Sequence, residues 1–158
     1  MGLSLTFRSF LLGCLLLVGC SSDVETPEQQ LRRLVQAAEL AVENRDLSAA
    51  MAFVDEGYQD AEGRGWPQIR AMLAGYLLRH PSIHILSKID RVELKGETEA
   101  EMVVLAGLAG STQEAETPLG QWRGRLIRLA LNFQRNQSGE WRLKKAEWRA
   151  AQREDFVE

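Results

Sequence analysis

The sequence predicts an α+β domain in which helices come first and a meander of antiparallel strands follows. Up to about residue 80, apolar residues recur at helical spacing. From Ser82 onward they alternate or run together, as they do in strands. Helical and extended segments are therefore segregated along the chain, which is typical of the α+β class.

The first helix is predicted to begin at Pro27. Thr26 is suited to cap it, Pro27 fits the first helical position, and Gln29 completes a capping box. Apolar residues then follow on one stripe: Leu31, Leu34, Ala37, Ala38 and Ala41. Asn44, Arg45 and Asp46 end this helix. Asp46 then caps a second helix over about 47–54, whose inner side would hold Leu47, Ala50 and Val54.

A turn with a short strand is predicted for residues 56–65. A third helix then opens at Trp66-Pro67, because proline is favoured in the first turn of a helix. Its apolar positions are Ile69, Leu73, Tyr76 and Leu77. It ends at His80, since a residue before proline resists the helical conformation.

Four long strands are predicted for the remainder. The first covers 82–94, with an irregularity near 87–91 that would bend it. The second, 101–109, is almost continuously apolar and is expected to be buried on both faces. A polar loop at 110–121 leads to a strand over 122–135 that ends in a hairpin turn at Asn136-Gln137-Ser138-Gly139, and the last strand covers 140–148. The tail from Ala150 is polar and is predicted to fray.

The order of these elements resembles the nuclear transport factor 2-like superfamily. Three local phrases are similar as well: 44–47 between two helices, 58–60 before the third helix, and 139–143 at the end. The resemblance implies a cone whose curved antiparallel sheet wraps three N-terminal helices. It also implies a cone mouth that holds a small apolar ligand and homodimers that form through the outer sheet face. A cystatin-like sheet with fewer helices is the alternative fold.

The first 19 residues have the parts of a secretion signal. Arg8 precedes a short apolar run from Phe10 to Val18, which is too short to span a membrane as a stable anchor. Leu17-Val18-Gly19-Cys20 resembles the bacterial lipobox. The resemblance implies that Cys20 receives lipid and becomes the first residue of the mature protein. The alternative is an ordinary signal followed by a chance cysteine.

The mature chain is then divided into a lipidated tether at 20–26, one domain at 27–149 and a polar tail at 150–158. Its partner is the lipid bilayer, through Cys20. Ser21 follows the modified cysteine where an aspartate would resemble an inner-membrane retention signal, so the outer membrane facing the periplasm is favoured. Because Cys14 lies in the signal, the folded domain has no free thiol and no disulfide.

The net charge of −3 argues against nucleic-acid binding. Charge is uneven, however, because residues 121–158 hold nine Lys/Arg against five Asp/Glu. Two strands with basic solvent-facing sides explain this excess. The alternative is a basic patch that meets anionic headgroups or an acidic partner.

Catalytic candidates are few. The superfamily that this sequence resembles includes the enzymes ketosteroid isomerase, scytalone dehydratase and limonene epoxide hydrolase. These enzymes place Asp, Tyr, His or Arg inside the cone. None of the catalytic residues of these enzymes can be assigned to a position in this sequence. Asp60 is a weak candidate for a catalytic base, and its alternative role is a solvated carboxylate in a turn. His84 is a second weak candidate base. Two histidines without suitable carboxylate spacing predict no metal site, and no cofactor motif is present.

A ligand pocket is predicted from apolar and aromatic side chains, and core packing is the alternative role for the same residues. The two-sided apolar strand 101–109 also predicts a homodimer or partner interface through the sheet, unless the tail covers that face. The favoured function is a periplasmic lipoprotein that binds a small apolar ligand or an envelope partner without catalysis. The alternative is an isomerase, dehydratase or hydrolase. The predicted ligand-binding residues are Trp66, Tyr76, Leu129, Leu131, Phe133 and Trp141.

Overall fold

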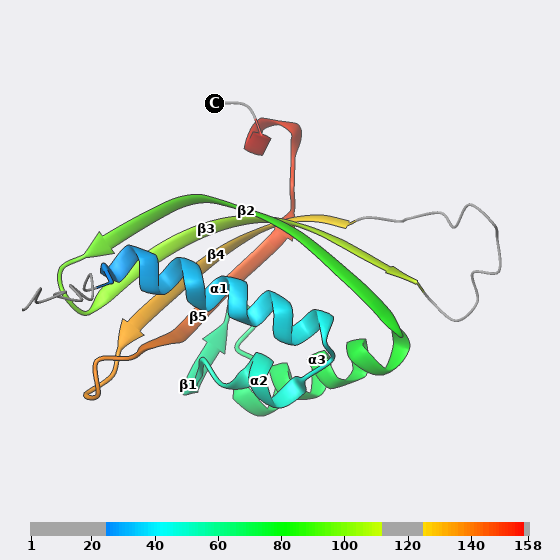
Figure 1. Cartoon of the computed structure of the whole chain (residues 1–158), viewed down its shortest axis with the longest axis horizontal. Helices are drawn as coiled ribbons and strands as arrows, with labels where there is room; N and C mark the ends of the chain where they lie inside the picture. The colour runs from blue at the N-terminus through cyan, green and yellow to red at the C-terminus, as the bar shows by residue number, and fades with distance from the viewer. Residues whose placement is uncertain (1–24, 112–124, 157–158) are drawn as a thin grey trace, which may run out of the picture.

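The computed structural model describes residues 25–111 and 125–156, and these form three helices against one curved sheet (Figure 1). The predicted signal, most of the tether and residues 112–124 lie outside the described residues. The elements are α1 (Pro27–Glu43), α2 (Leu47–Met51), β1 (Val54–Asp60), α3 (Trp66–Arg79), β2 (Ser82–Lys95), β3 (Glu99–Ser111), β4 (Arg125–Arg135), β5 (Trp141–Ala150) and a short 3₁₀ helix at Arg153–Phe156.

Helix α1 begins as its sequence predicts. The Thr26 hydroxyl accepts a hydrogen bond from the Gln29 backbone, and the Gln29 side chain accepts one from the Thr26 backbone at 2.8 Å. This reciprocal pair is the capping box. The expected second helix is too long, however, because α2 ends at Met51. Val54 opens strand β1 instead, where its β-branched side chain suits extended backbone and its partner is Leu143.

The sheet has the order β1-β5-β4-β3-β2, and its four long strands are antiparallel neighbours. The expectation of a wholly antiparallel sheet is wrong at one edge, where β1 runs parallel to β5. The Leu143 backbone N–H donates to the Phe53 carbonyl at 2.9 Å and ties the two together. The predicted irregularity in β2 is confirmed as a register shift between Ile89 and Arg91.

The hairpin between β4 and β5 is also confirmed. The Asn136 backbone N–H donates to the Glu140 carbonyl at 2.9 Å, and the Asn136 side-chain oxygen accepts from the backbones of Ser138 and Glu140. Gly139 has φ of 80°, a left-handed conformation that glycine adopts without a steric cost. The turn residues therefore hold the start of β5 beside the end of β4.

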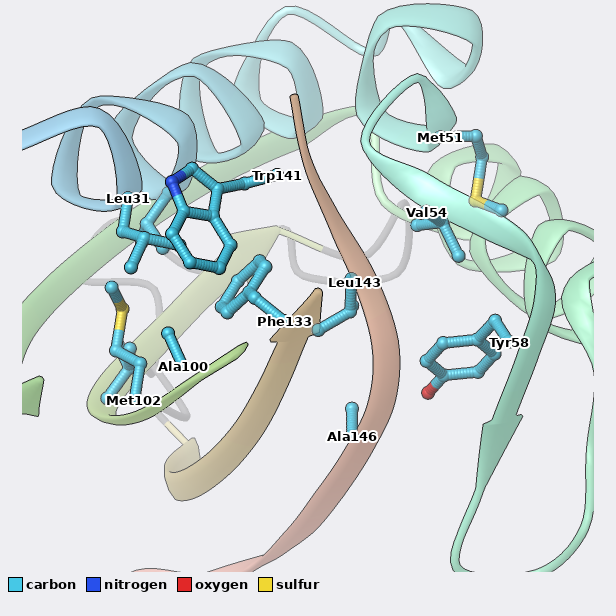
Figure 2. Close-up of a cluster of buried hydrophobic side chains, with 12 residues drawn as sticks. Leu31, Met51, Val54, Tyr58, Ala100, Met102, Phe133, Trp141, Leu143 and Ala146 are labelled. Carbon is cyan, nitrogen blue, oxygen red and sulfur yellow. The ribbon is translucent and has the colours of Figure 1, made fainter. Parts of the chain in front are cut away.

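The core lies between the helices and the concave face of the sheet (Figures 1 and 2). Strand β3 supplies its centre, with Ala100, Met102 and Val104 almost fully buried against the helices. On the opposite face of β3, Val103 and Leu105 are also buried, which confirms the prediction of a strand buried on both faces. Helix α1 crosses this concave face and buries Leu31 completely.

The prediction of a frayed tail is wrong for residues 151–156, which leave β5 on the side of the sheet away from the helices (Figure 1). Asp155 pairs there with Arg149 at 2.7 Å and with Arg128 at 3.5 Å. Hydrogen bonds from the Arg149 side chain and the Gln152 backbone, together with the positive charges of Arg149 and Arg128, lower the pKa of Asp155 to about 2. The tail thus lies over part of the face on which a homodimer was predicted, and the homodimer stays a prediction.

Candidate functional site

An open groove lies along the outside of α1, on the side of the β4–β5 hairpin. Its volume is about 630 Å³. Helix α1 forms one wall, the segment from α2 into β1 forms another, and the start of β5 closes the end. The lining residues are Gln30, Arg33, Leu34, Ala37, Ala38, Ala49, Ala52, Phe53, Gly139, Glu140, Trp141 and Arg142.

The groove owes its apolar floor to residues of two sizes. Ala37 and Ala38 on α1 face Ala49 and Ala52 across the groove, and their short side chains leave space between the walls. Large apolar side chains border this space: Leu34, Phe53 and Trp141. Leu34 and Phe53 are half-buried and pack against the core. The floor is therefore continuous with the hydrophobic core, although it is open to solvent.

Polar side chains form the rim. Gln30 accepts a hydrogen bond from Arg135 Nη2 at 2.8 Å and donates to the Glu25 carbonyl at 3.0 Å. Arg33 pairs with the Glu25 carboxylate at 2.7 Å, although its own side chain is 70% exposed. Arg142 pairs with Glu140 at 2.7 Å and donates to the Ala52 carbonyl. The arrangement of an apolar floor within a polar rim is typical of ligand sites.

Trp141 connects the groove to the core. It is only 4% exposed, yet it lines the groove, and the guanidinium of Arg135 lies 5.0 Å from its ring centroid. Figure 2 shows its indole nitrogen on the side toward α1. Within residues 25–111 and 125–156, neither Trp141 Nε1 nor Arg135 Nε has a hydrogen-bond acceptor. Two contacting side chains, one of which lines the groove, thus each hold a buried donor without an acceptor.

Four of the other five predicted ligand-binding residues lie in or against the core, and Tyr76 does not. Phe133 is 2% exposed, and Leu129, Leu131 and Trp66 are half-buried against the same cluster. Tyr76 lies on α3, where its ring is 4.2 Å from the ring of His80, between centroids. Of the six, only Trp141 lines the groove. The structure therefore brings five of the six predicted residues together as core or core-packed side chains.

Asp60 lies at the end of β1 with its side chain fully buried. Its carboxylate accepts hydrogen bonds from the backbones of Glu62 and Arg64, at 2.9 and 2.8 Å, and from Arg64 Nε at 2.5 Å. Burial raises the pKa of Asp60, but the hydrogen bonds from Arg64 and Glu62 outweigh it and leave the pKa below its usual value. A low pKa and a full set of donors suit a carboxylate that holds a tight loop.

The pH dependence of stability follows from this arrangement. Because the folded-state pKa of Asp60 is lowered, its contribution is complete above the ordinary value of 3.8 and is lost as the pH falls through the folded pKa. We expect Asp60→Asn to lower the melting temperature at pH 7, and the gap from the unchanged chain to narrow below pH 3.8. Thermal melts followed by circular dichroism measure both values.

The matched control for that substitution is Glu56→Gln, on the same strand, because Glu56 is exposed. It should leave the melting temperature nearly unchanged at either pH. A gap for Asp60→Asn that stays constant from pH 7 to pH 3 would contradict the assignment of the buried ion pair.

Tyr58 lies two residues before Asp60 on β1 and is 3% exposed. Burial, and then the charge of Asp60, raise the pKa of Tyr58 to about 12. The phenol is therefore protonated at any physiological pH. Beside it, Arg64 reaches over the ring of Trp148, with its guanidinium 5.0 Å from the ring centroid. Arg64 thus pairs with two carboxylates in this region, the buried Asp60 and the exposed Glu62.

His84 lies on β2 with an exposed side chain, and its Nε2 is 3.4 Å from the Ser82 hydroxyl. Neither His84 nor Asp60 lines the groove. In the part of the chain that the structure describes, no three His, Cys, Asp or Glu side chains gather in a way that fits a metal ion. In the same part, no helix combines the length and apolar character needed to cross a membrane.

Most of the groove was not foreseen from the sequence. Arg33, Phe53 and Arg142 lie far apart in the chain, and only the contact of the hairpin with α1 brings them together. One local signal was present, however. Helix α1 carries Ala37 and Ala38 where longer side chains would fill the gap, and Ala49 and Ala52 follow on the opposite wall.

Comparisons with known proteins show the fold. No family model matches the chain. No curated protein matches it either. Among solved structures, it is similar to a putative dehydratase of the NTF2-like family from Streptomyces avermitilis, with a TM-score of 0.65, 15% identity and coverage of 79% of this chain and 97% of that one. A ketosteroid isomerase-like protein from Erwinia carotovora gives a TM-score of 0.62, 10% identity and coverage of 80% and 99%.

Bd1075 from Bdellovibrio bacteriovorus is also similar, with a TM-score of 0.62 and 13% identity. The match covers 79% of this chain but only 41% of that longer chain. The predicted nuclear transport factor 2-like α+β fold is therefore confirmed. At these identities the likeness establishes the fold alone, and the fold serves many functions.

Proposed function

We propose that this chain is a lipid-anchored domain of the bacterial envelope that binds a small apolar ligand without catalysing a reaction. The groove beside α1 is the main support. Its volume of about 630 Å³ falls within the range of roughly 300–1,000 Å³ that is usual for ligand sites. Its floor is apolar, and its polar groups stand at the rim, where they would orient a ligand.

The position of the groove suits a protein held on a membrane. The lipobox-like residues end at Cys20, and α1 begins at Pro27. The groove uses the part of α1 from Gln30 to Ala38 and leaves its last turn out. A ligand that leaves the bilayer surface would therefore meet this part of the domain first. Under the proposal the protein faces the periplasm from the outer membrane.

The described interior favours binding over catalysis. An active site needs titratable side chains that converge on one pocket. The side chains that β3 and β4 direct toward the helices are apolar: Ala100, Met102, Val104, Leu129, Leu131 and Phe133. Asp60 is already engaged by Arg64 and by two backbone N–H groups. Asp60, the carboxylate that would act as a base, is thus already used to hold a loop.

An isomerase, dehydratase or hydrolase is the second candidate, and one observation favours it. Tyr58 and Asp60 are both buried on β1, so a phenol and a carboxylate lie close together. Such a site would need Asp60 to release Arg64 when substrate binds. Turnover of an apolar carbonyl or epoxide substrate that disappears in Tyr58→Phe would favour the enzyme over the binding protein.

The proposal predicts that filling the groove abolishes ligand binding. Ala37 is an exposed groove residue, so Ala37→Trp should occupy the space while the chain folds normally. The anchored full chain in phosphatidylcholine nanodiscs would be irradiated with a photoreactive twelve-carbon alcohol, and the labelled peptides would be identified by mass spectrometry. We expect labels on α1 and on the start of β5, and at least a fivefold loss in Ala37→Trp.

Gln36→Trp provides the matched control, because Gln36 is the exposed neighbour of Ala37 and does not line the groove. It adds the same indole to the same helix and should leave labelling unchanged. If both tryptophan variants label like the unchanged chain, the groove is not the binding site. If labels appear only on the outer face of β3 and β4, the domain instead offers that face to a partner.

A further inference from the structure

We infer that the ligand of this groove is a single-chain anionic amphiphile, a hydrocarbon tail with a carboxylate head, delivered from the bilayer that holds the protein. The inference rests on the proposed function, since it names the chemical class of the ligand for the same groove. Four features of the groove support it: the charge of the rim, the unpartnered donors of the wall, the shape of the floor and the place where the tether enters.

The rim is cationic on balance. The rim holds three arginines, Arg33, Arg135 and Arg142, against two carboxylates, Glu25 and Glu140, so it carries one net positive charge. Arg33 holds Glu25 through one nitrogen and is 70% exposed, so its remaining N–H donors face solvent. An anionic head placed at this rim gains charge-assisted hydrogen bonds, which are stronger than bonds between neutral groups.

The wall of the groove also offers hydrogen-bond donors that have no acceptor. Trp141 Nε1 and Arg135 Nε are buried and find no acceptor among the residues that the structure describes. Trp141 is a lining residue of the groove. Buried donors are almost always paired, so each of these N–H groups favours an acceptor that comes from outside the described chain. A carboxylate offers only acceptors, whereas a cationic head would add further donors.

The shape of the floor suits an extended tail. The groove follows α1 from Gln30 to Ala38, which corresponds to about 12 Å at the usual helical rise of roughly 1.5 Å per residue. Leu34, Ala37 and Ala38 lie along this strip, and Phe53 and Trp141 face it. A flexible hydrocarbon chain covers such a strip along its length.

The tether brings the groove close to the bilayer. Glu25 contacts two lining residues, since its carbonyl accepts from Gln30 and its carboxylate pairs with Arg33. The chain therefore enters the domain at the groove itself. Glu25 is five residues after Cys20. At about 3.3–3.6 Å per residue, these five residues span at most roughly 18 Å. An amphiphile that leaves the bilayer beside the anchor meets this rim directly.

The test compares two photoreactive twelve-carbon probes that differ only in the head, a carboxylate and an alcohol. Each is loaded into phosphatidylcholine nanodiscs that carry the anchored full chain. We expect the carboxylate probe to label the groove at least threefold more than the alcohol. Arg33→Gln should remove most of that preference. Arg32→Gln, which changes the adjacent arginine that pairs with Glu28 outside the groove, should keep it.

The outcomes separate the inference from the proposed function. Equal labelling of the groove by both probes would overturn the anionic ligand and leave apolar binding in place. Absence of groove labelling by either probe would overturn both. Membrane delivery has its own test, because a Cys20→Ser chain added to vesicles that contain the carboxylate probe should be labelled at least threefold more slowly. Equal rates would overturn delivery from the bilayer.

Discussion

Replacing Leu31 with alanine is expected to lower the free energy of unfolding by about 2–5 kcal/mol, the range for truncating a buried leucine. Leu31 and Val35 carry α1 into the core, and Leu31 is 0% exposed. Its neighbours in the cluster include Met102 and Trp141 (Figure 2). Because these side chains belong to different elements, they cannot all move into the space that the leucine leaves. Urea denaturation followed by circular dichroism gives the value.

Leu40→Ala is the matched control for this prediction. It removes the same atoms from the same helix at a position that is 59% exposed, and substitutions at such sites usually change stability by less than about 0.5 kcal/mol. A small effect at Leu31, or equal effects at the two positions, would show that α1 is not packed on the sheet in this way.

Replacing Cys20 with serine is expected to move the protein from the membrane fraction to the soluble fraction. Each buried CH₂ of an acyl chain contributes about 0.8 kcal/mol to membrane binding, so the loss of several chains removes the anchor completely. Fractionation of cells and immunoblotting of the pellet and supernatant measure the change. Cys14→Ser, in the apolar run of the signal, should leave the protein in the membrane fraction. If the Cys20 variant sediments with the membranes as before, the anchor assignment is wrong.

Much of the fold was predictable because its signals are local. The capping box of α1 uses residues within one helical turn, and the hairpin at Asn136 needs only a left-handed glycine and one side-chain acceptor. The continuous apolar run of β3 predicted burial on both faces, and Met102 and Val103 confirm it from opposite faces. Patterns of this kind survive because local preference and tertiary packing agree.

The errors arose where distant contacts decide the structure. Val54 is compatible with the end of a helix by spacing, but pairing with Leu143 draws it into β1. That strand is parallel to β5, a relation that no nearby residue indicates. The tail looked merely polar, yet Asp155 finds Arg128 and Arg149 on two neighbouring strands. In each case the partner lies outside the window in which periodicity is informative.

The candidate site was harder to foresee than the fold. Aromatic residues predicted a pocket, but Phe133 and most of its companions fill the core, which is the common fate of large apolar side chains. The groove instead arises from small residues, chiefly Ala37 and Ala52, where the hairpin meets α1. Space left by short side chains has no sequence pattern of its own. The alternative role given to Asp60, a solvated turn carboxylate, is wrong, because its side chain is buried and paired with Arg64.

The most direct test of the account is native mass spectrometry of the protein purified from its own membrane. We expect a chain that begins at an acylated Cys20 and carries one non-covalent amphiphile, which is absent from Ala37→Trp and present in Gln36→Trp. A chain that keeps residues 1–19 with an unmodified thiol at Cys20, and holds no ligand that depends on Ala37, would contradict it.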